Sequence, residues 1–368
     1  MKKRNVSTII LLVFLAVFLV GIFIISQSFG GLMKMQSFHM LLILVVFIIF
    51  FIIFSIINKN SRRPGRFFIS SETTPEFENL YTDLCSNYFN NLKKFQIITR
   101  CFIICVFIFL AFLFIFPNNI VKLASIILVF ACVILSIVFK NKYVAEYKNV
   151  VIYNFVKLFN HKLDYSKNSE YELFMKSFID SNFEVSGFSK FYSDDYIKGY
   201  LNENTFIRMS DIKVEKIVRD KRDNTREKIT LFEGIFAFTT SIKNINTYLK
   251  ISLNRFRFFK PRNTVEMDSS EFESYFDVVS PDKILTMRIL THDVMDTLID
   301  FYKTYNLSFE IAFKNNFIYL RFYTGPMFEP KIWNNSLDKK LLYTYYCILS
   351  FIIAVSKNVN KALEDIEI

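Results

Sequence analysis

The sequence predicts an α-helical membrane region of four transmembrane helices, arranged as two hairpins, followed by a cytoplasmic α+β domain with antiparallel β-hairpins. Three observations lead to this fold class. The longest apolar segments lie in the first 139 residues, and basic residues gather on alternate connections between them. Beyond residue 191 the pattern changes to short runs of β-branched and aromatic residues separated by turn sequences, which is typical of strands.

Four apolar segments each have the length, about 17–25 residues, that a helix needs to cross a hydrocarbon core roughly 30 Å thick. They cover residues 8–25, 40–57, 97–116 and 120–139. The connections within the first pair and within the second pair are short, so each pair predicts a helical hairpin. We therefore expect a transmembrane region at 1–139, with a cytoplasmic loop at 58–96, and a cytoplasmic domain at 140–368.

The location of the basic residues predicts the orientation. The formal net charge is +11, and residues 1–139 hold 12 Lys or Arg against 4 Asp or Glu. Because Lys and Arg accumulate on the cytoplasmic side of short loops, their alternation predicts that both termini lie in the cytoplasm. Residues 140–368 hold 33 basic against 30 acidic residues, and this near balance gives no reason to expect a nucleic-acid partner.

The cytoplasmic loop carries two features of its own. Arg62, Arg63 and Arg66 could contact anionic lipid head groups, although their simpler role is to determine the topology. Further along, apolar residues recur at helical spacing within 75–94, which predicts a short amphipathic helix.

After the fourth span the helical pattern continues over 142–163, so we expect the last membrane helix to extend into the cytoplasm and couple the domain to the membrane. A second helix is expected at 170–180. The runs 205–218 and 228–240 flank a charged turn and predict a first β-hairpin. A third strand candidate follows at 248–253.

A second β-hairpin is predicted from the runs 307–314 and 317–323. Asn315 and Asn316 lie between these runs, and asparagine tolerates the positive φ that a tight turn requires. Between the two hairpins, residues 292–305 have the apolar spacing of an amphipathic helix.

The final helix is expected at 339–363. Its middle, 341–355, is apolar enough to suggest a fifth span. The segment is short and interrupted by Tyr, Thr and Ser, so a buried helix of the domain is the favoured interpretation.

No motif points to catalysis, a cofactor or a metal. His292 and Asp293 could form half of a catalytic triad, but no nucleophile motif accompanies them, and their place after Thr291 fits a helix start. Asp194 and Asp195 could offer carboxylates to a divalent ion, although a surface turn is the simpler interpretation. Phosphate-binding glycine loops are absent from the sequence, so we expect neither an enzyme nor a cofactor.

The five cysteines form no framework. Cys101 and Cys105 are one helical turn apart, but two thiols without His or carboxylate partners make a poor metal site. We expect them to be small apolar fillers on a helix face.

Several short motifs occur in order between residues 140 and 355. They are Tyr192–Gly199, Leu231–Phe236, Glu271–Val278, Leu290-Thr291 and Asn315–Tyr319. This ordered set resembles an uncharacterised bacterial membrane-anchored family catalogued as domain of unknown function 3137. The resemblance implies a home in the bacterial inner membrane and carries no established activity.

The resemblance also implies that the motif residues have structural roles. These residues are Asp195, Gly199, Phe232, Gly234, Phe272, Phe276, Leu290 and Thr291. A Phe-x-Gly sequence before an apolar strand suits a bulge or a close backbone approach. Phe272 and Phe276 are one helical turn apart, as two core residues of a helix would be.

These observations favour a non-enzymatic scaffold, sensor or partner-binding module that is held at the lipid bilayer. Its expected partners are lipid head groups, a cytoplasmic protein or further copies of the chain. The alternative is an oligomeric channel or transporter regulated by the cytoplasmic domain. The third span is interrupted near its start by Arg100, but the apolar cores of the spans contain no charge of the kind that ion-coupled transporters use.

Overall fold

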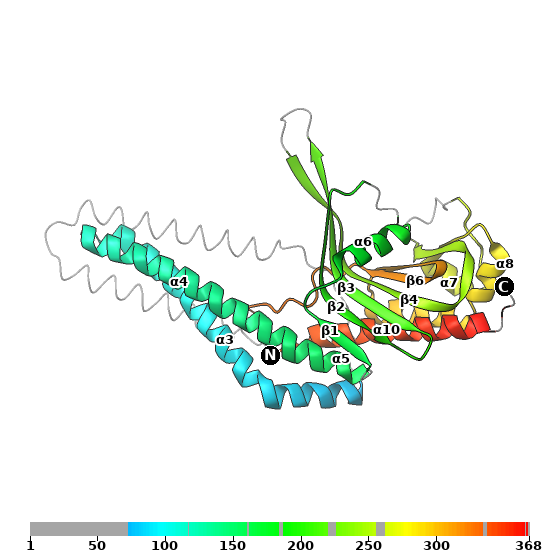
Figure 1. Ribbon diagram of the computed structural model, residues 1–368, viewed down its shortest axis with the longest axis horizontal. Helices are drawn as coiled ribbons and strands as arrows, with labels where there is room; N and C mark the ends of the chain where they lie inside the picture. The colour runs from blue at the N-terminus through cyan, green and yellow to red at the C-terminus, as the bar shows by residue number, and fades with distance from the viewer. Residues whose placement is uncertain are drawn as a thin grey trace. The chain divides into compact units, whose positions relative to one another are not determined.

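A computed structural model describes the chain from residue 73 onward, with short gaps (Figure 1). The described residues are 73–116, 118–159, 162–183, 187–219, 226–254, 262–333, 337–364 and 366. The expected spans at 8–25 and 40–57 lie outside them, as do Arg62, Arg63 and Arg66.

Contacts between residues group the chain into two compact units. One unit comprises Met1–Arg63 and Phe107–Leu128, and the other comprises Pro64–Val106 and Val129–Ile368. The boundary expected after residue 139 stays a prediction.

Two long helices open the described part of the chain. They are α3 (Pro75–Ile115) and α4 (Asn119–Glu146). α3 joins the expected short helix within 75–94 to the expected span at 97–116, so the prediction of two separate elements was wrong. No Gly or Pro occurs between residues 76 and 115, and nothing else in the sequence ends the helix there.

α4 continues directly into the π-helix η1 (Tyr147–Ile152) and then into α5 (Tyr153–Phe159). The helical pattern expected to reach residue 163 therefore ends earlier, and Leu163 is the first residue of a strand.

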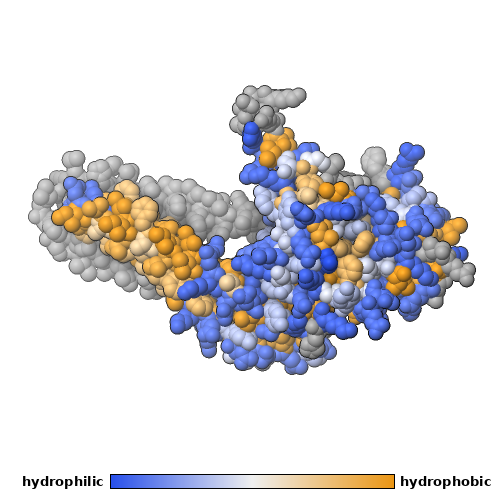
Figure 2. Space-filling view, in the orientation of Figure 1, coloured by the Kyte–Doolittle hydropathy of each residue, from blue (hydrophilic) through white to orange (hydrophobic). Residues whose placement is uncertain are grey.

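Among the described residues, three helical segments are long and apolar enough to cross a membrane, judged by length and composition. They are Pro75–Ile115, Asn119–Phe159 and Lys339–Glu364. In the first two only 11% of the most apolar window is buried, against 67% in the third. Figure 2 shows the apolar surface along α4, where large side chains are exposed, including those of Ile120, Leu123, Ile127, Phe130 and Ile134. This surface indicates a membrane association.

The strands of the described residues form one antiparallel sheet. They are β1 (Leu163–Ser166), β2 (Lys190–Tyr200), β3 (Phe206–Arg219), β4 (Arg226–Leu253), β5 (Phe276–Val279) and β6 (Phe309–Phe322). The order is β1-β2-β3-β4-β5, and β6 also pairs with β4. The pairing of β3 with β4 confirms the first predicted hairpin.

β6 folds back on itself at Asn315, whose φ is 55°. The backbone N–H of Tyr323 donates to the carbonyl of Ser308 at 3.0 Å, so the two ends of β6 meet. An ion pair of 2.6 Å between Arg321 and Glu310 also joins its two halves. These contacts confirm the second predicted hairpin.

β4 pairs with both halves of this hairpin. Its residues 235–240 pair with the second half of β6, and its residues 249–252 pair with the first half. Ile245 pairs with Asn315 between these two stretches, so β4 passes round the turn of β6. The expected third strand at 248–253 is thus the end of β4.

Five further helices complete the described part of the domain. They are α6 (Tyr171–Asp180), α7 (Ser270–Tyr275), α8 (Lys283–Ile289), α9 (His292–Tyr305) and α10 (Lys339–Glu364). α6, α9 and α10 agree with the predicted helices within a residue or two, whereas α8 was not predicted.

Side chains alternate between the two faces of the sheet, as a strand period of two requires. On β4, Phe236 and Phe238 belong to an aromatic core shared with Phe174 of α6. Ile235 and Ala237 belong to the larger core on the opposite face, which also contains side chains of α3, η1, α5, α9 and α10. The sheet therefore lies between helices on both faces.

α10 packs within this larger core. Leu349 and Ile352 have no exposed surface. The side chain of Asn360 accepts a hydrogen bond from Ile242 N at 3.0 Å, and the hydroxyls of Ser356 and Thr239 are 3.1 Å apart. This burial and bonding support the interpretation of α10 as a helix of the domain.

Candidate functional site

Lys148 is a buried lysine surrounded by carboxylates. Its side chain is 1% exposed, and its Nζ lies 2.7 Å from Asp195 Oδ2, 2.7 Å from Glu329 Oε1 and 3.3 Å from Asp194 Oδ2. Buried lysines are rare unless they are paired. The four side chains, called here the Lys148 cluster, come from η1, β2 and the loop after β6.

The π-helix explains how a lysine on this helix reaches the domain. Buried residues occur in adjacent pairs that repeat every four positions: 147–148, 151–152 and 155–156. A regular α-helix of 3.6 residues per turn would rotate such pairs away from one face. The wider turn of a π-helix keeps them aligned, and such segments are frequent at functional sites.

Asp195 is placed by a β-bulge. The register between β2 and β3 shifts between Asp194 and Tyr196, and Asp195 adopts a positive φ of 53°. Such a bulge re-aims a side chain, and the carboxylate of Asp195 turns inward with only 2% exposed. The prediction of a surface turn at Asp194 and Asp195 was therefore wrong.

Two further hydrogen bonds hold this bulge. The hydroxyl of Tyr165 on β1 donates to Asp195 Oδ1. The hydroxyl of Ser210 on β3 donates to the carbonyl of Asp194 at 2.7 Å. The strands on both sides of β2 thus fix the backbone and the carboxylate of the bulge.

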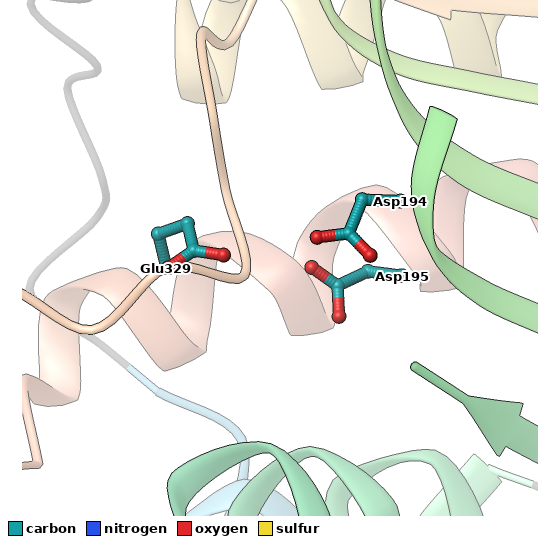
Figure 3. Close-up of side chains that lie close together, drawn as sticks. All are labelled: Asp194, Asp195 and Glu329. Carbon is teal, nitrogen blue, oxygen red and sulfur yellow. The ribbon is translucent and has the colours of Figure 1, made fainter. Parts of the chain in front are cut away.

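The loop after β6 supplies the remaining carboxylate. Gly325 N donates to Glu233 O at 3.1 Å, and Met327 N donates to Asp211 Oδ2 at 2.7 Å. These bonds dock the loop on β3 and β4 and bring Glu329 to Lys148. Figure 3 shows Glu329 approaching Asp194 and Asp195 from this loop.

The pKa values follow from burial and from these bonds. Burial raises the pKa of Asp195 to about 6, although its hydrogen bonds with Lys148 and Tyr165 oppose the rise. Burial also raises the pKa of Asp211 to about 8, against the effect of the Met327 N–H. Burial lowers the pKa of Lys148, but its hydrogen bonds with Asp195 and Glu329 outweigh this, and the pKa lies above its usual value.

The chemistry of the cluster follows from its charges. Oxygen atoms of Asp194, Asp195 and Glu329 lie within 4.8 Å of one another, a spacing that could hold a metal ion. The ammonium of Lys148 already lies within 3.3 Å of all three carboxylates, in the place where such a metal ion would bind. A protonated amine is neither a nucleophile nor a general base. The arrangement is instead suited to holding η1, β2 and the loop after β6 together.

The other residues singled out in the sequence are spread over the domain. Gly199 of β2 pairs with Leu163, and a Cβ there would lie 2.3 Å from Lys162 O. At Gly234 of β4 the φ is 152°, and a Cβ would lie 2.1 Å from Phe322 O. Both glycines therefore permit close backbone approaches.

The remaining motif residues are buried or begin a helix. Phe232 is 1% exposed and lies in the aromatic core. Phe272 lies on α7 but Phe276 begins β5, so the expectation that they share one helix was wrong. Both are buried, and their ring centroids are 5.0 Å apart. Leu290 is buried, and Thr291 is the residue before α9, where its side chain makes no capping bond. Of all the residues singled out in the sequence, the Lys148 cluster includes Asp194 and Asp195.

Sequence reasoning did not connect Lys148, Tyr165, Asp211 and Glu329, which are distant in sequence. One signal was available. Lys148 interrupts a run of apolar residues that repeat at helical spacing after the fourth span, and a lysine on the buried face of a helix needs a partner.

Comparison with protein families gives a match over part of the chain. Residues 230–361 match the family described as protein of unknown function DUF3137, which confirms the resemblance drawn from the motifs. The matched segment contains Phe232, Gly234, Phe272, Phe276 and Leu290, whereas Asp195 lies before it.

One solved structure is similar, that of the mycobacterial trehalose monomycolate transport factor A. The identity is 10% and the TM-score 0.32, over 57% of this chain and 90% of that one. No curated protein matches the chain.

Proposed function

We propose that this chain is a multi-pass protein of the bacterial inner membrane, with four spans in two hairpins and both termini in the cytoplasm. Its α+β domain acts as a non-enzymatic scaffold or sensor that binds a cytoplasmic protein partner. The Lys148 cluster joins the helix that leaves the membrane to this domain.

One observation carries the proposal. α4, η1 and α5 follow one another without a break, and Lys148 in η1 bonds to carboxylates of β2 and of the loop after β6. A helix that is apolar and exposed in one part and bonded into the sheet in another is suited to pass a mechanical signal. This role needs no catalytic group: the ammonium of Lys148 offsets one of the three carboxylate charges around it and holds the three elements together.

Crosslinking in intact cells tests the function. The full chain should recover one cytoplasmic partner in a stoichiometric amount, and Lys148→Met should reduce that recovery while the chain stays in the membrane fraction. Lys157→Met is the matched control, because this lysine lies on α5 and pairs with a largely exposed Asp164. We expect the control to behave as wild type.

A different result would favour the oligomeric channel or transporter. Reconstituted vesicles would then show conductance or solute uptake, and crosslinking would recover only further copies of the chain. That combination would overturn the scaffold proposal.

A further inference from the structure

The single tryptophan of the chain, Trp333, lies beside the base of the membrane helices. The guanidinium of Arg100 on α3 lies over its ring, 5.7 Å from the centroid. Arg100 Nε donates to Ile332 O at 2.7 Å, and the side-chain amide of Gln96 donates to Lys331 O at 3.2 Å. Two hydrogen bonds and a cation–π contact thus fix this loop on α3.

The composition of α3 changes at this point. Every residue from Cys101 to Ile115 is apolar, whereas Gln96 and Thr99 are polar and buried against other parts of the protein. Arg100 therefore marks the level on α3 at which the packed domain ends and the apolar surface begins.

α4 changes at the same level. The rings of Phe102 and Phe139 stack, with centroids 5.7 Å apart, so these positions of the two helices are neighbours. Phe139 is the last apolar residue before Lys140 and Lys142, which are both exposed. A helix from Asn119 to Phe139 is about 30 Å long, close to the thickness of a hydrocarbon core.

Trp333 itself has the exposure of an interfacial residue. The residue is 50% exposed although its side chain is large and apolar. Tryptophan is enriched where the hydrocarbon meets the head groups, because its ring is apolar and its N–H is polar. Lysines at this level attract anionic lipids.

We propose that Trp333, Arg100, Lys140 and Lys142 form an interfacial belt that lies among the head groups of anionic phospholipids and sets the depth of the domain at the membrane. The belt rests on the membrane insertion proposed above. It goes beyond that proposal by naming the lipid class and the residues that meet it.

The tryptophan makes the test direct, because the fluorescence excited beyond the absorption of tyrosine comes from Trp333 alone. The full chain is reconstituted in phosphatidylcholine vesicles containing phospholipids brominated near the head group or deep in the acyl chain. The shallow bromine should quench more strongly than the deep bromine, and aqueous iodide should quench weakly. Strong quenching by iodide with none by either brominated lipid, in vesicles that carry the chain on flotation, would overturn the belt.

A second comparison tests the lipid class. A small fraction of brominated phosphatidylglycerol should quench Trp333 more than the same fraction of brominated phosphatidylcholine. The double substitution Lys140→Gln and Lys142→Gln should reduce this extra quenching. We expect the affinity for phosphatidylglycerol relative to phosphatidylcholine to fall roughly fivefold for each lysine removed. The matched control replaces Lys176 and Lys190, exposed lysines of α6 and β2, and should leave the extra quenching unchanged.

The outcomes separate the two proposals. Equal quenching by both brominated lipids would overturn the anionic preference. A chain that does not float with the vesicles would contradict the membrane insertion on which both proposals depend.

Discussion

At the scale of single residues, Lys148 and Asp195 are the buried pair on which the stability of the described part of the domain should depend most. Both are almost fully buried, and each supplies the charge that the other lacks. An unpaired buried charge is strongly unfavourable, so the loss of one partner costs more than the pair contributes. The stability of the domain should therefore depend on Lys148 more than on a lysine of the surface.

Lys148→Met tests this dependence. The substitution keeps the length of the side chain and leaves Asp195 without its cation, so the free energy of unfolding should fall by about 3 kcal/mol. This value is at the lower end for a buried pair, because Asp194 and Glu329 are 55% and 48% exposed and stay solvated. Urea unfolding of the purified chain in detergent gives the measurement. Lys157→Met should change the midpoint little, and equal effects of the two substitutions would contradict the assignment.

Asp211 predicts a pH dependence. Its carboxyl keeps a proton in the folded protein up to a pH of about 8, whereas the ordinary pKa is 3.8. The folded state then binds more protons than the unfolded state between these values, so stability falls as pH rises through this range. Asp195, whose pKa is raised from 3.8 to about 6, adds to this loss of stability only below a pH of about 6.

Asp211→Asn isolates this contribution. The amide keeps an oxygen that can accept a hydrogen bond from Met327 N, but it does not titrate. The variant should therefore lose less stability than wild type as the pH rises from 6.5 to 9, with the difference arising below and up to the raised pKa of Asp211. Unfolding midpoints measured across this range provide the test. Asp296→Asn, on an exposed position of α9, is the control and should keep the wild-type slope.

At the scale of elements, the junction of β4 with β6 depends on Gly234. A Cβ at this position would lie 2.1 Å from Phe322 O and 2.8 Å from Thr324 N, both backbone atoms. Phe322 pairs with Ile235, so its carbonyl cannot move without disturbing the pairing of the two strands. Gly325 lies nearby in sequence with a φ of 68°, but a Cβ there would meet nothing within 4 Å.

Gly234→Ala should therefore destabilise the domain by at least about 3 kcal/mol. Gly325→Ala carries only the backbone cost of a left-handed residue, about 1–2 kcal/mol. Thermal unfolding followed by circular dichroism compares the two variants. A larger loss for Gly325→Ala would show that backbone conformation, and not the close approach, governs this junction.

The elements also show what the sequence could predict. The helix at 292–305 and the hairpin at Asn315 were found because both signals are local: an apolar period and a turn residue. β2 was missed because its bulge at Asp195 interrupts the alternation of a strand. The Lys148 cluster was missed because it joins residues 148, 195 and 329, and no local pattern records contacts between such distant positions.

At the scale of the whole molecule, the distribution of charge sets the expected orientation. Lys140 and Lys142 follow α4, and the connection between α3 and α4 near Asn118 carries no charge. Because lysine and arginine beside a span are retained in the cytoplasm, the connection should face the periplasm and Lys140 the cytoplasm. The Lys148 cluster and the domain would then lie in the cytoplasm.

A reporter enzyme that is active only outside the cytoplasm tests this orientation. Fused after Lys140, it should be inactive, because α3 and α4 together return the chain to the cytoplasmic side. Fused after Asn118, between the two helices, it should be active, and this second fusion is the positive control. The reverse result would place the domain outside the cytoplasm, where it could not meet a cytoplasmic partner. Activity of both fusions would mean that α4 does not cross the membrane, and the Lys148 cluster could not then couple a membrane helix to the domain.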